Sequence, residues 1–402
     1  MMHMQINYAR FISTKYFFPV AFFLFLVGYL KLPIIADFKI HYIIPIIFIL
    51  YIFLQKDLKI TIIYFLFFIL SLSSSLFSYL VFDILSYDIS RAVFSLFLFA
   101  SNFIIFFITV NLMNLKQLLK AIYFSSILYS FFVLWDIVSM FKKGAFVRYQ
   151  GTFQDPNYIV ILFLLFIATS IYYIDRHRNI IMKLFSFYLV MVYFIAILVT
   201  FSRSGYLASV IFLITFLLLS KNRTKSFSLF LIICFVFSIF ILNQKELFEK
   251  LLQFLEWRFF SESEIIGGMS RVYEIKAGFS FFVSEFPLSL TGMGIGSSEI
   301  TDFFSKYYDN ASVIHPRIHN TFASVLFEQG ILSFIIFFII LVKNFNLLIK
   351  NKEVYRYFMP LYLATLVSSL FIWNLYYLPF YIVIFYIPYL AHKEIRSPKR
   401  LR

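Results

Sequence analysis

The strongest constraint on this chain is a series of long apolar segments that few polar residues interrupt. A helix needs about 20 consecutive apolar residues to cross a bilayer core, and continuous runs of this kind indicate helices rather than strands. Hydrophobic residues make up 62% of the chain and charged residues only 14%, which is more apolar surface than a soluble protein can bury. Only helices and closed barrels satisfy their backbone hydrogen bonds in lipid. The sequence therefore predicts an all-α, polytopic membrane protein.

The apolar segments predict about twelve membrane spans in a single domain that covers residues 1–402. The second span is short, and the first two are also consistent with a re-entrant hairpin. The predicted spans cover residues 16–35, 41–54, 60–82, 92–112, 118–140, 157–174, 180–200, 205–220, 226–243, 319–342, 357–373 and 376–391.

The charges between the spans predict how the protein is oriented. If the N-terminus is cytoplasmic, the cytoplasmic side carries 21 Lys and Arg residues against 4 Asp and Glu, and the outer side carries 14 against 16. This distribution follows the positive-inside rule and places both termini in the cytoplasm. The net charge of +15 then reflects topology and attraction to anionic lipid. Because the basic residues are scattered over separate loops, they do not indicate a nucleic-acid partner.

The outer side has one large loop, at about residues 244–318 between the ninth and tenth spans. Polar residues recur at helical spacing over residues 245–260, which predicts an amphipathic helix at the membrane surface. A second helix is expected to start at Ser270, a good helix cap. The sequence TGMGIG at 291–296 follows no strand, so we interpret it as a tight loop rather than a phosphate-binding motif.

Three predicted spans begin on the outer side with polar or basic residues, namely 157–174, 205–220 and 319–342. Helix N-termini present free N–H groups and partial positive charge, which suit phosphate, and arginine adds a two-pronged donor. If the three starts converge, they form an anion site where the membrane meets water. The polar residues at or before these starts are Arg148 and Asn157, then Arg203, then His315, Arg317, His319 and Asn320.

Each of these residues also has a structural interpretation. An arginine at the end of a span often only reaches toward lipid headgroups. For Arg203 the two interpretations are balanced, whereas Arg148 and Arg317 alone favour the structural one. Glu328 lies inside a predicted span, where an acid is usually functional; pairing with a buried donor is the structural alternative. Arg91 follows two aspartates and is consistent with an ion pair.

Four motifs occur along the chain in a defined order. They are GTFQDPN at 151–157, FSRSG at 201–205, SRVYEIKAGFSFF continuing to GMGIG over 270–296, and HNTFASVLFEQGIL at 319–332. Together, their order and spacing resemble the O-antigen ligase/polymerase family of bacterial integral membrane glycosyltransferases. The resemblance implies a helical GT-C-type fold, a polyprenyl-diphosphate-linked oligosaccharide as donor, and no cofactor, metal or nucleotide sugar.

The resemblance also implies roles for individual residues. Arg203 and Arg271 are expected to stabilise negative charge on the leaving diphosphate. His319 is expected to take the proton of the incoming sugar hydroxyl, or to bind the diphosphate as a cation; the sequence leaves both open. Attack at the anomeric carbon would invert its configuration. The further candidates for binding diphosphate or glycan are Arg148, Arg317, His315, Asn157, Asn320, Arg91 and Glu328.

Two reactions are known in this family. A polymerase joins lipid-linked repeat units, whereas a ligase transfers a finished glycan to an acceptor such as lipid A–core. The GTFQDPN stretch and the moderate outer loop favour the polymerase. The donor must first be brought to the outer face, so a flippase and a chain-length regulator are expected partners. A transporter or flippase is the alternative from another class, but transporters place polar sites near the midplane, often in repeated halves.

Overall fold

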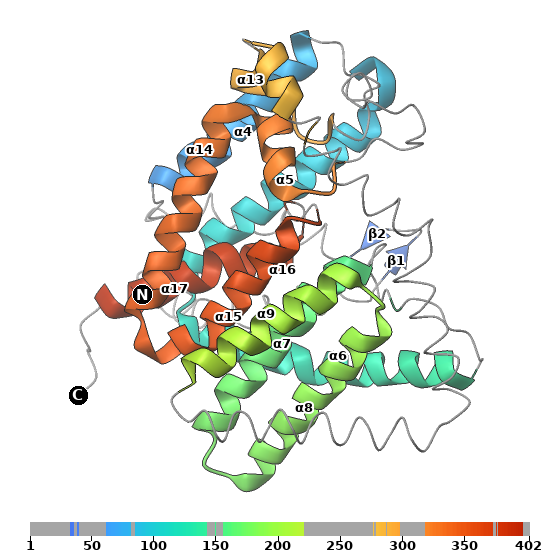
Figure 1. The fold of residues 1–402 in the computed structure, drawn as a ribbon, viewed down its shortest axis with the longest axis vertical. Helices are drawn as coiled ribbons and strands as arrows, with labels where there is room; N and C mark the ends of the chain where they lie inside the picture. The colour runs from blue at the N-terminus through green and yellow to red at the C-terminus, as the bar shows by residue number, and fades with distance from the viewer. Residues whose placement is uncertain are drawn as a thin grey trace, which may run out of the picture.

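The computed structural model describes residues 33–35, 38–39, 62–81, 85–142, 149, 156–220, 276, 279–286, 288–297, 318–372, 375 and 377–396. The described part is a bundle of helices with one small hairpin (Figure 1). The elements are β1 (Pro33–Ile35), β2 (Phe38–Lys39), α4 (Ile62–Val81), α5 (Leu85–Leu112), α6 (Leu115–Lys142), α7 (Pro156–Arg176), α8 (Ile180–Val199), α9 (Arg203–Leu219), α13 (Leu288–Thr291), α14 (Thr321–Lys350), α15 (Lys352–Ser369), α16 (Leu378–Tyr381), the π-helix η4 (Ile382–Tyr386) and α17 (Ile387–Arg396).

The predicted all-α polytopic class is confirmed. Within the described residues, six helices are long and apolar enough to cross a membrane: α4, α5 from Val93, α6, α7, α8 and α14. Nine predicted spans coincide with helices, and the last of them is divided among α16, η4 and α17. The predicted spans 41–54 and 226–243, the amphipathic helix at 245–260 and the start at Ser270 lie outside the described residues.

One predicted boundary is wrong. The first span was expected to extend to residue 35, but residues Pro33–Ile35 form strand β1, which pairs antiparallel with β2. Proline lacks the N–H that a helix interior needs, and its ring clashes with the preceding turn.

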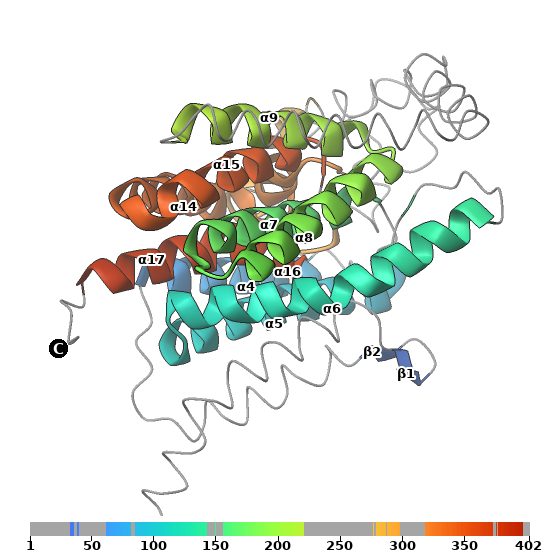
Figure 2. The same cartoon turned by 90° about the horizontal axis from the view of Figure 1, so that it is seen from below.

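Helix α7 lies at the centre of the bundle. Its residues from Pro156 to Tyr172 are all buried, which fits a helix that is apolar all the way round. It packs against α8, α9 and α15, while α14 packs against α4 and α15. Figure 2 shows α9 lying along α15 on one side of the bundle and α6 crossing the opposite side. The start and end of α7 thus lie at opposite ends of the bundle, each among other helix ends.

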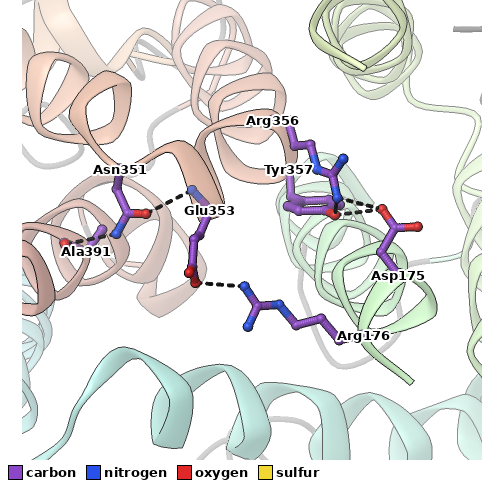
Figure 3. A network of polar contacts seen from close by, with 7 residues as sticks. All are labelled: Asp175, Arg176, Asn351, Glu353, Arg356, Tyr357 and Ala391. Carbon is purple, nitrogen blue, oxygen red and sulfur yellow. Dashed lines mark hydrogen bonds and ion pairs between the residues drawn. The ribbon is translucent and has the colours of Figure 1, made fainter. Parts of the chain in front are cut away.

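A polar network holds one of these ends together (Figure 3). At the end of α7, Asp175 accepts a hydrogen bond of 2.9 Å from Arg356 and Arg176 donates one of 2.8 Å to Glu353, both partners belonging to the first turns of α15. Asn351 caps α15 and donates to the Ala391 carbonyl of α17 at 3.0 Å. These helix ends are the ones that the charge pattern predicts to be cytoplasmic.

Inside the bundle, a single asparagine connects three elements. Asn344 of α14 is fully buried. Its Oδ1 accepts a hydrogen bond from the hydroxyl of Tyr64 in α4, and its Nδ2 donates to the Ile384 carbonyl in η4 at 2.8 Å. A buried polar group is costly without partners, so these bonds specify how α14 sits between α4 and η4.

We expect Asn344→Ala to lower the free energy of unfolding by about 1–3 kcal/mol, because it leaves the Tyr64 hydroxyl and the Ile384 carbonyl without this partner. Thermal unfolding of the purified protein in detergent measures the effect. Asn346→Ala is the matched control, since Asn346 is exposed on the same helix. Equal losses in both variants would contradict the proposed role of Asn344.

Candidate active site at the starts of α7, α9 and α14

The starts of α7 and α9 are joined by hydrogen bonds. Ser202 caps α9 by accepting from the Gly205 N–H at 2.9 Å. Its hydroxyl also donates to Oδ1 of Asn157 in the first turn of α7, and the Ser204 hydroxyl donates to the same oxygen at 3.0 Å. Asn157 is buried at 6% exposure. We call Asn157, Ser202 and Ser204 the α7–α9 clamp.

Local backbone chemistry explains why the chain turns here. Phe201, between α8 and α9, has a φ of 49°, in the left-handed region that non-glycine residues adopt only under local constraint. The Thr200 hydroxyl donates to the Ile197 carbonyl at 2.6 Å and closes the end of α8. Gly205 permits the close approach of the two helices, because a Cβ there would lie 2.6 Å from Cγ2 of Val160.

The clamp fixes the position of Arg203. We expected Arg203 in the turn before the helix, but the structure makes it the first residue of α9, directly after the cap. Its side chain is half-buried. As the first helical residue, it lies beside backbone N–H groups that have no intrahelical partner and at the positive end of the helix dipole. Helix α7 starts at Pro156, one residue before the predicted span 157–174, and proline is favoured at a first helical position.

The start of α14 is built in a different way. Asn320 caps the helix, and its Oδ1 accepts from the N–H groups of Phe322 and Ala323, both at 2.9 Å. Its Nδ2 donates to the Leu370 carbonyl at the end of α15 at 2.9 Å. The next residue, Thr321, donates to the Ile372 carbonyl at 2.6 Å. His319 is half-buried and directly precedes this anchored cap.

The end of α15 connects the three starts. It holds the start of α14 through Asn320 and Thr321, and α15 runs along α9. The segment that follows it brings Tyr377 onto Tyr158 in the first turn of α7, with the rings stacked at 3.7 Å between centroids. The three starts therefore belong to the same end of the bundle, opposite the network of Figure 3.

The structure gives a positioning role to two predicted binding residues. The amide groups of Asn157 and Asn320 hydrogen-bond to neighbouring parts of the chain. Contact of either residue with substrate stays a prediction. Arg91 lies in α5, and its side chain is outside the described part of the chain. The other candidates outside the described residues are Arg148, Arg271, His315 and Arg317.

Tyr149, in the segment before α7, is anchored at the same end. Its N–H donates to the Val199 carbonyl at the end of α8 at 3.1 Å, and its hydroxyl donates to Asp136 of α6 at 3.4 Å. Burial, followed by the nearby Tyr129 and Asp136, raises the pKa of Tyr149 well above its usual value. The phenol therefore stays protonated and serves as a hydrogen-bond donor.

Helix α14 is broken in its N-terminal third. Gly330 has φ 77° and ψ 174°, which separates residues 321–329 from residues 331–350. A break of this kind removes intrahelical partners from the preceding carbonyls. Here the N–H groups of Met293 and Gly294 donate to the carbonyls of Phe327 and Glu328, at 2.9 and 2.8 Å. The TGMGIG segment, predicted as a tight loop, thus supplies hydrogen bonds to the carbonyls next to the break.

Two glycines make this contact possible. Gly292 and Gly330 both have a positive φ, of 79° and 77°. A Cβ on Gly330 would lie 2.3 Å from the Leu290 carbonyl oxygen, and one on Gly292 would lie 2.4 Å from the Gly330 nitrogen. Since these are backbone atoms, neither position has room for a side chain.

Helix α4 holds the other side of the loop. Ser78 donates to the Gly292 carbonyl at 2.6 Å, Ser74 donates to the Thr291 carbonyl, and Ser75 accepts from the Ile295 N–H at 2.9 Å. Ser71 donates to Gln329 at 2.7 Å. We did not predict these serines as functional, although their spacing of three, four and seven residues puts them on one face of an apolar helix. This polar face on an apolar helix is the sequence feature that could have identified these serines.

Glu328 lies beside this loop contact. Its side chain is fully buried, two residues before the break. Its predicted contact with diphosphate or glycan stays a prediction. Among the described residues, no group of three or more His, Cys, Asp or Glu side chains is arranged to hold a metal ion.

The fold and these helix starts define an integral membrane protein in which Arg203, His319 and three polar helix starts share one end of the bundle. Residues 187–338 match the family model described as O-antigen ligase. The match runs from α8 into α14 and includes Arg203, Arg271, His319 and Glu328. It confirms the predicted relationship to the O-antigen ligase/polymerase family and implies a glycosyl-transfer enzyme acting on lipid-linked glycans. No curated protein matches the chain.

We expect Gly330→Ala and Gly292→Ala each to lower the free energy of unfolding by about 1–3 kcal/mol, because each forces a left-handed backbone and a backbone clash. Since the two glycines touch each other, the double variant should lose clearly less than the sum of the single losses. Thermal unfolding in detergent measures all three. Ser333→Ala, a buried site just beyond the break, is the control. Additive losses would contradict the shared contact.

Proposed function

We propose that this protein polymerises undecaprenyl-diphosphate-linked repeat units of a bacterial surface polysaccharide, such as O-antigen or capsule, on the outer face of the cytoplasmic membrane. The observation that carries the proposal is the α7–α9 clamp, which sets Arg203 in the first turn of α9. The family match that includes this turn and His319 supports a transfer reaction over transport.

The helix starts suit the chemistry of a diphosphate leaving group. The hydroxyl oxygen of the acceptor sugar bonds to the anomeric carbon of the donor, the bond from that carbon to the diphosphate breaks, and its electron pair leaves on the diphosphate. Fixed positive groups that meet this new charge stabilise the transition state more than the ground state. Arg203 and the N–H groups of the α9 start supply such charge, and Arg271 is proposed to add to it. The reaction needs no metal and inverts the anomeric carbon.

His319 is proposed to take the proton that the acceptor hydroxyl loses. Imidazole is suited to this because its ordinary pKa lies near neutral pH. The anchored cap at Asn320 restricts where His319 can lie, which a general base requires. Binding of the diphosphate by a cationic His319 is the alternative, and the two roles respond differently to substitution.

The orientation is part of the proposal. The charge pattern places both termini in the cytoplasm, so the starts of α7, α9 and α14 face outward. The donor is then delivered across the membrane by a flippase, and a chain-length regulator is a second proposed partner. Ligation of a finished glycan to lipid A–core is the alternative reaction. The GTFQDPN stretch and the moderate outer loop favour the polymerase over it.

The test supplies the purified protein with a lipid-linked repeat unit of its host and no other acceptor, and separates the products on a gel. A ladder of lipid-linked oligomers is the expected result. If the donor stays unchanged until lipid A–core is added and is then consumed, the protein is a ligase and the polymerase assignment is wrong. Donor that stays unchanged in both reactions would contradict a transferase.

Arg203→Ala should lower the rate of product formation by about 100-fold or more, as the loss of one preorganised charge donor does in other enzymes. Arg203→Lys keeps the charge but not the two-pronged donor, so its rate should lie between those of the wild type and Arg203→Ala. Arg178→Ala, at the exposed α7–α8 turn, is the matched control and should be unaffected. If Arg203→Ala inserts normally and retains full activity, the assignment of Arg203 is wrong.

His319→Gln should lower the rate by about 100-fold or more if His319 is the base. His319→Lys distinguishes the two roles, because a lysine restores a cation for diphosphate but is protonated and cannot serve as a base at neutral pH. We expect both variants to be inactive, with His177→Gln in the α7–α8 turn as the control. Activity in His319→Lys would assign His319 to diphosphate binding instead.

A further inference from the structure

A groove of about 580 Å³ lies between α14 and α17, far along α14 from His319. Phe338, Ile339 and Val342 form its apolar wall, and Lys343 and Lys350 of α14 with His392 of α17 line its polar part. Phe338, Ile339 and Val342 are 55%, 47% and 46% exposed. Side chains of this kind on the outside of a membrane helix face lipid. The groove is thus open to the bilayer.

The two kinds of residue are separated along the groove. From Phe338 to Lys350 the helix rises about 18 Å. The exposed apolar residues Phe338, Ile339 and Val342 come first along it and the lysines follow, with Asn346 and Leu347 lining the groove between the two lysines. Lys343 and Lys350 are seven residues apart, which is about two turns and brings both to one face. Lys343 also lies over the Tyr64 ring, with its Nζ 5.4 Å from the ring centroid.

The order of apolar and basic residues along the groove indicates which kind of ligand fits it. An apolar channel that leads to two ammonium groups complements a molecule with a hydrocarbon chain and a negative headgroup. Basic pockets between membrane helices on the cytoplasmic side bind anionic lipid headgroups, and each lysine near the surface contributes to that attraction. A free phosphate ion would leave the apolar wall unfilled, and a zwitterionic lipid carries no net charge for the lysines.

We propose that this groove binds one anionic glycerophospholipid. Its headgroup phosphate lies between Lys343 and Lys350, and an acyl chain runs along Phe338, Ile339 and Val342. The site belongs to the cytoplasmic leaflet in the orientation predicted from the charged loops. It lies at the opposite end of α14 from His319, so it is separate from the proposed transfer site and does not depend on it.

The test measures how lipid changes the thermal unfolding of the full-length protein in detergent, with phosphatidylglycerol, phosphatidylcholine or inorganic phosphate added. Phosphatidylglycerol alone is expected to raise the unfolding temperature. Lys343→Gln/Lys350→Gln should weaken its binding by about 30-fold, from about fivefold for each lysine. The control Lys116→Gln/Lys120→Gln removes the same charge from the exposed start of α6, on the same predicted side, and should respond like the wild type.

A second variant separates the groove from general charge attraction. Val342→Trp fills the apolar wall at an exposed position and keeps both lysines, so it should reduce phosphatidylglycerol binding while leaving the fold intact. Native mass spectrometry counts the bound lipid and should give one tightly bound phosphatidylglycerol in the wild type. Equal stabilisation of the lysine double variant, equal stabilisation by inorganic phosphate, or undiminished binding in Val342→Trp would each overturn the proposal.

Discussion

The organisation of the site depends on one shared acceptor, the side-chain oxygen of Asn157. Two serine hydroxyls from the start of α9 converge on this oxygen in the first turn of α7. In an apolar bundle, a polar group without partners is costly, so this arrangement holds two helix starts together and sets the first residue of α9. The same end of the bundle then carries Arg203, the stacked Tyr158 and Tyr377, and the anchored start of α14.

Polar contacts between segments also stabilise the break in α14. Gly330 interrupts the helix, and the loop from α13 satisfies the carbonyls that the break exposes, while serines of α4 hold the loop from the other side. Irregular backbone at such depth is tolerated where protein encloses it. The N-terminal segment of α14, which begins at the cap next to His319, is thereby attached to α4 and α15 as well as to the rest of its own helix.

Sequence reasoning reached the fold class and most helices because continuous apolar runs directly reflect the solvent around a membrane span. It also placed the three polar helix starts to within two residues, since capping chemistry is local. It expected Arg203 in the turn before α9, whereas Arg203 is the first residue of that helix, because a helix boundary depends on cap hydrogen bonds that spacing alone leaves undecided by a residue or two. The contact of Gly292 with Gly330 links positions 38 residues apart, and no local pattern encodes such a pairing. The serine face of α4 was visible in the sequence, but its partner was not.

The central claim is that the starts of α7, α9 and α14 bind the diphosphate of a lipid-linked donor. The most direct measurement is an electron cryomicroscopy structure of the protein with a non-reactive lipid-linked diphosphate analogue. We predict that its diphosphate lies at the first turn of α9, within hydrogen-bonding distance of Arg203, at the end of the bundle that also carries His319. A diphosphate bound near the middle of the bundle, or at the opposite end beside Arg176 and Arg356, would contradict this claim.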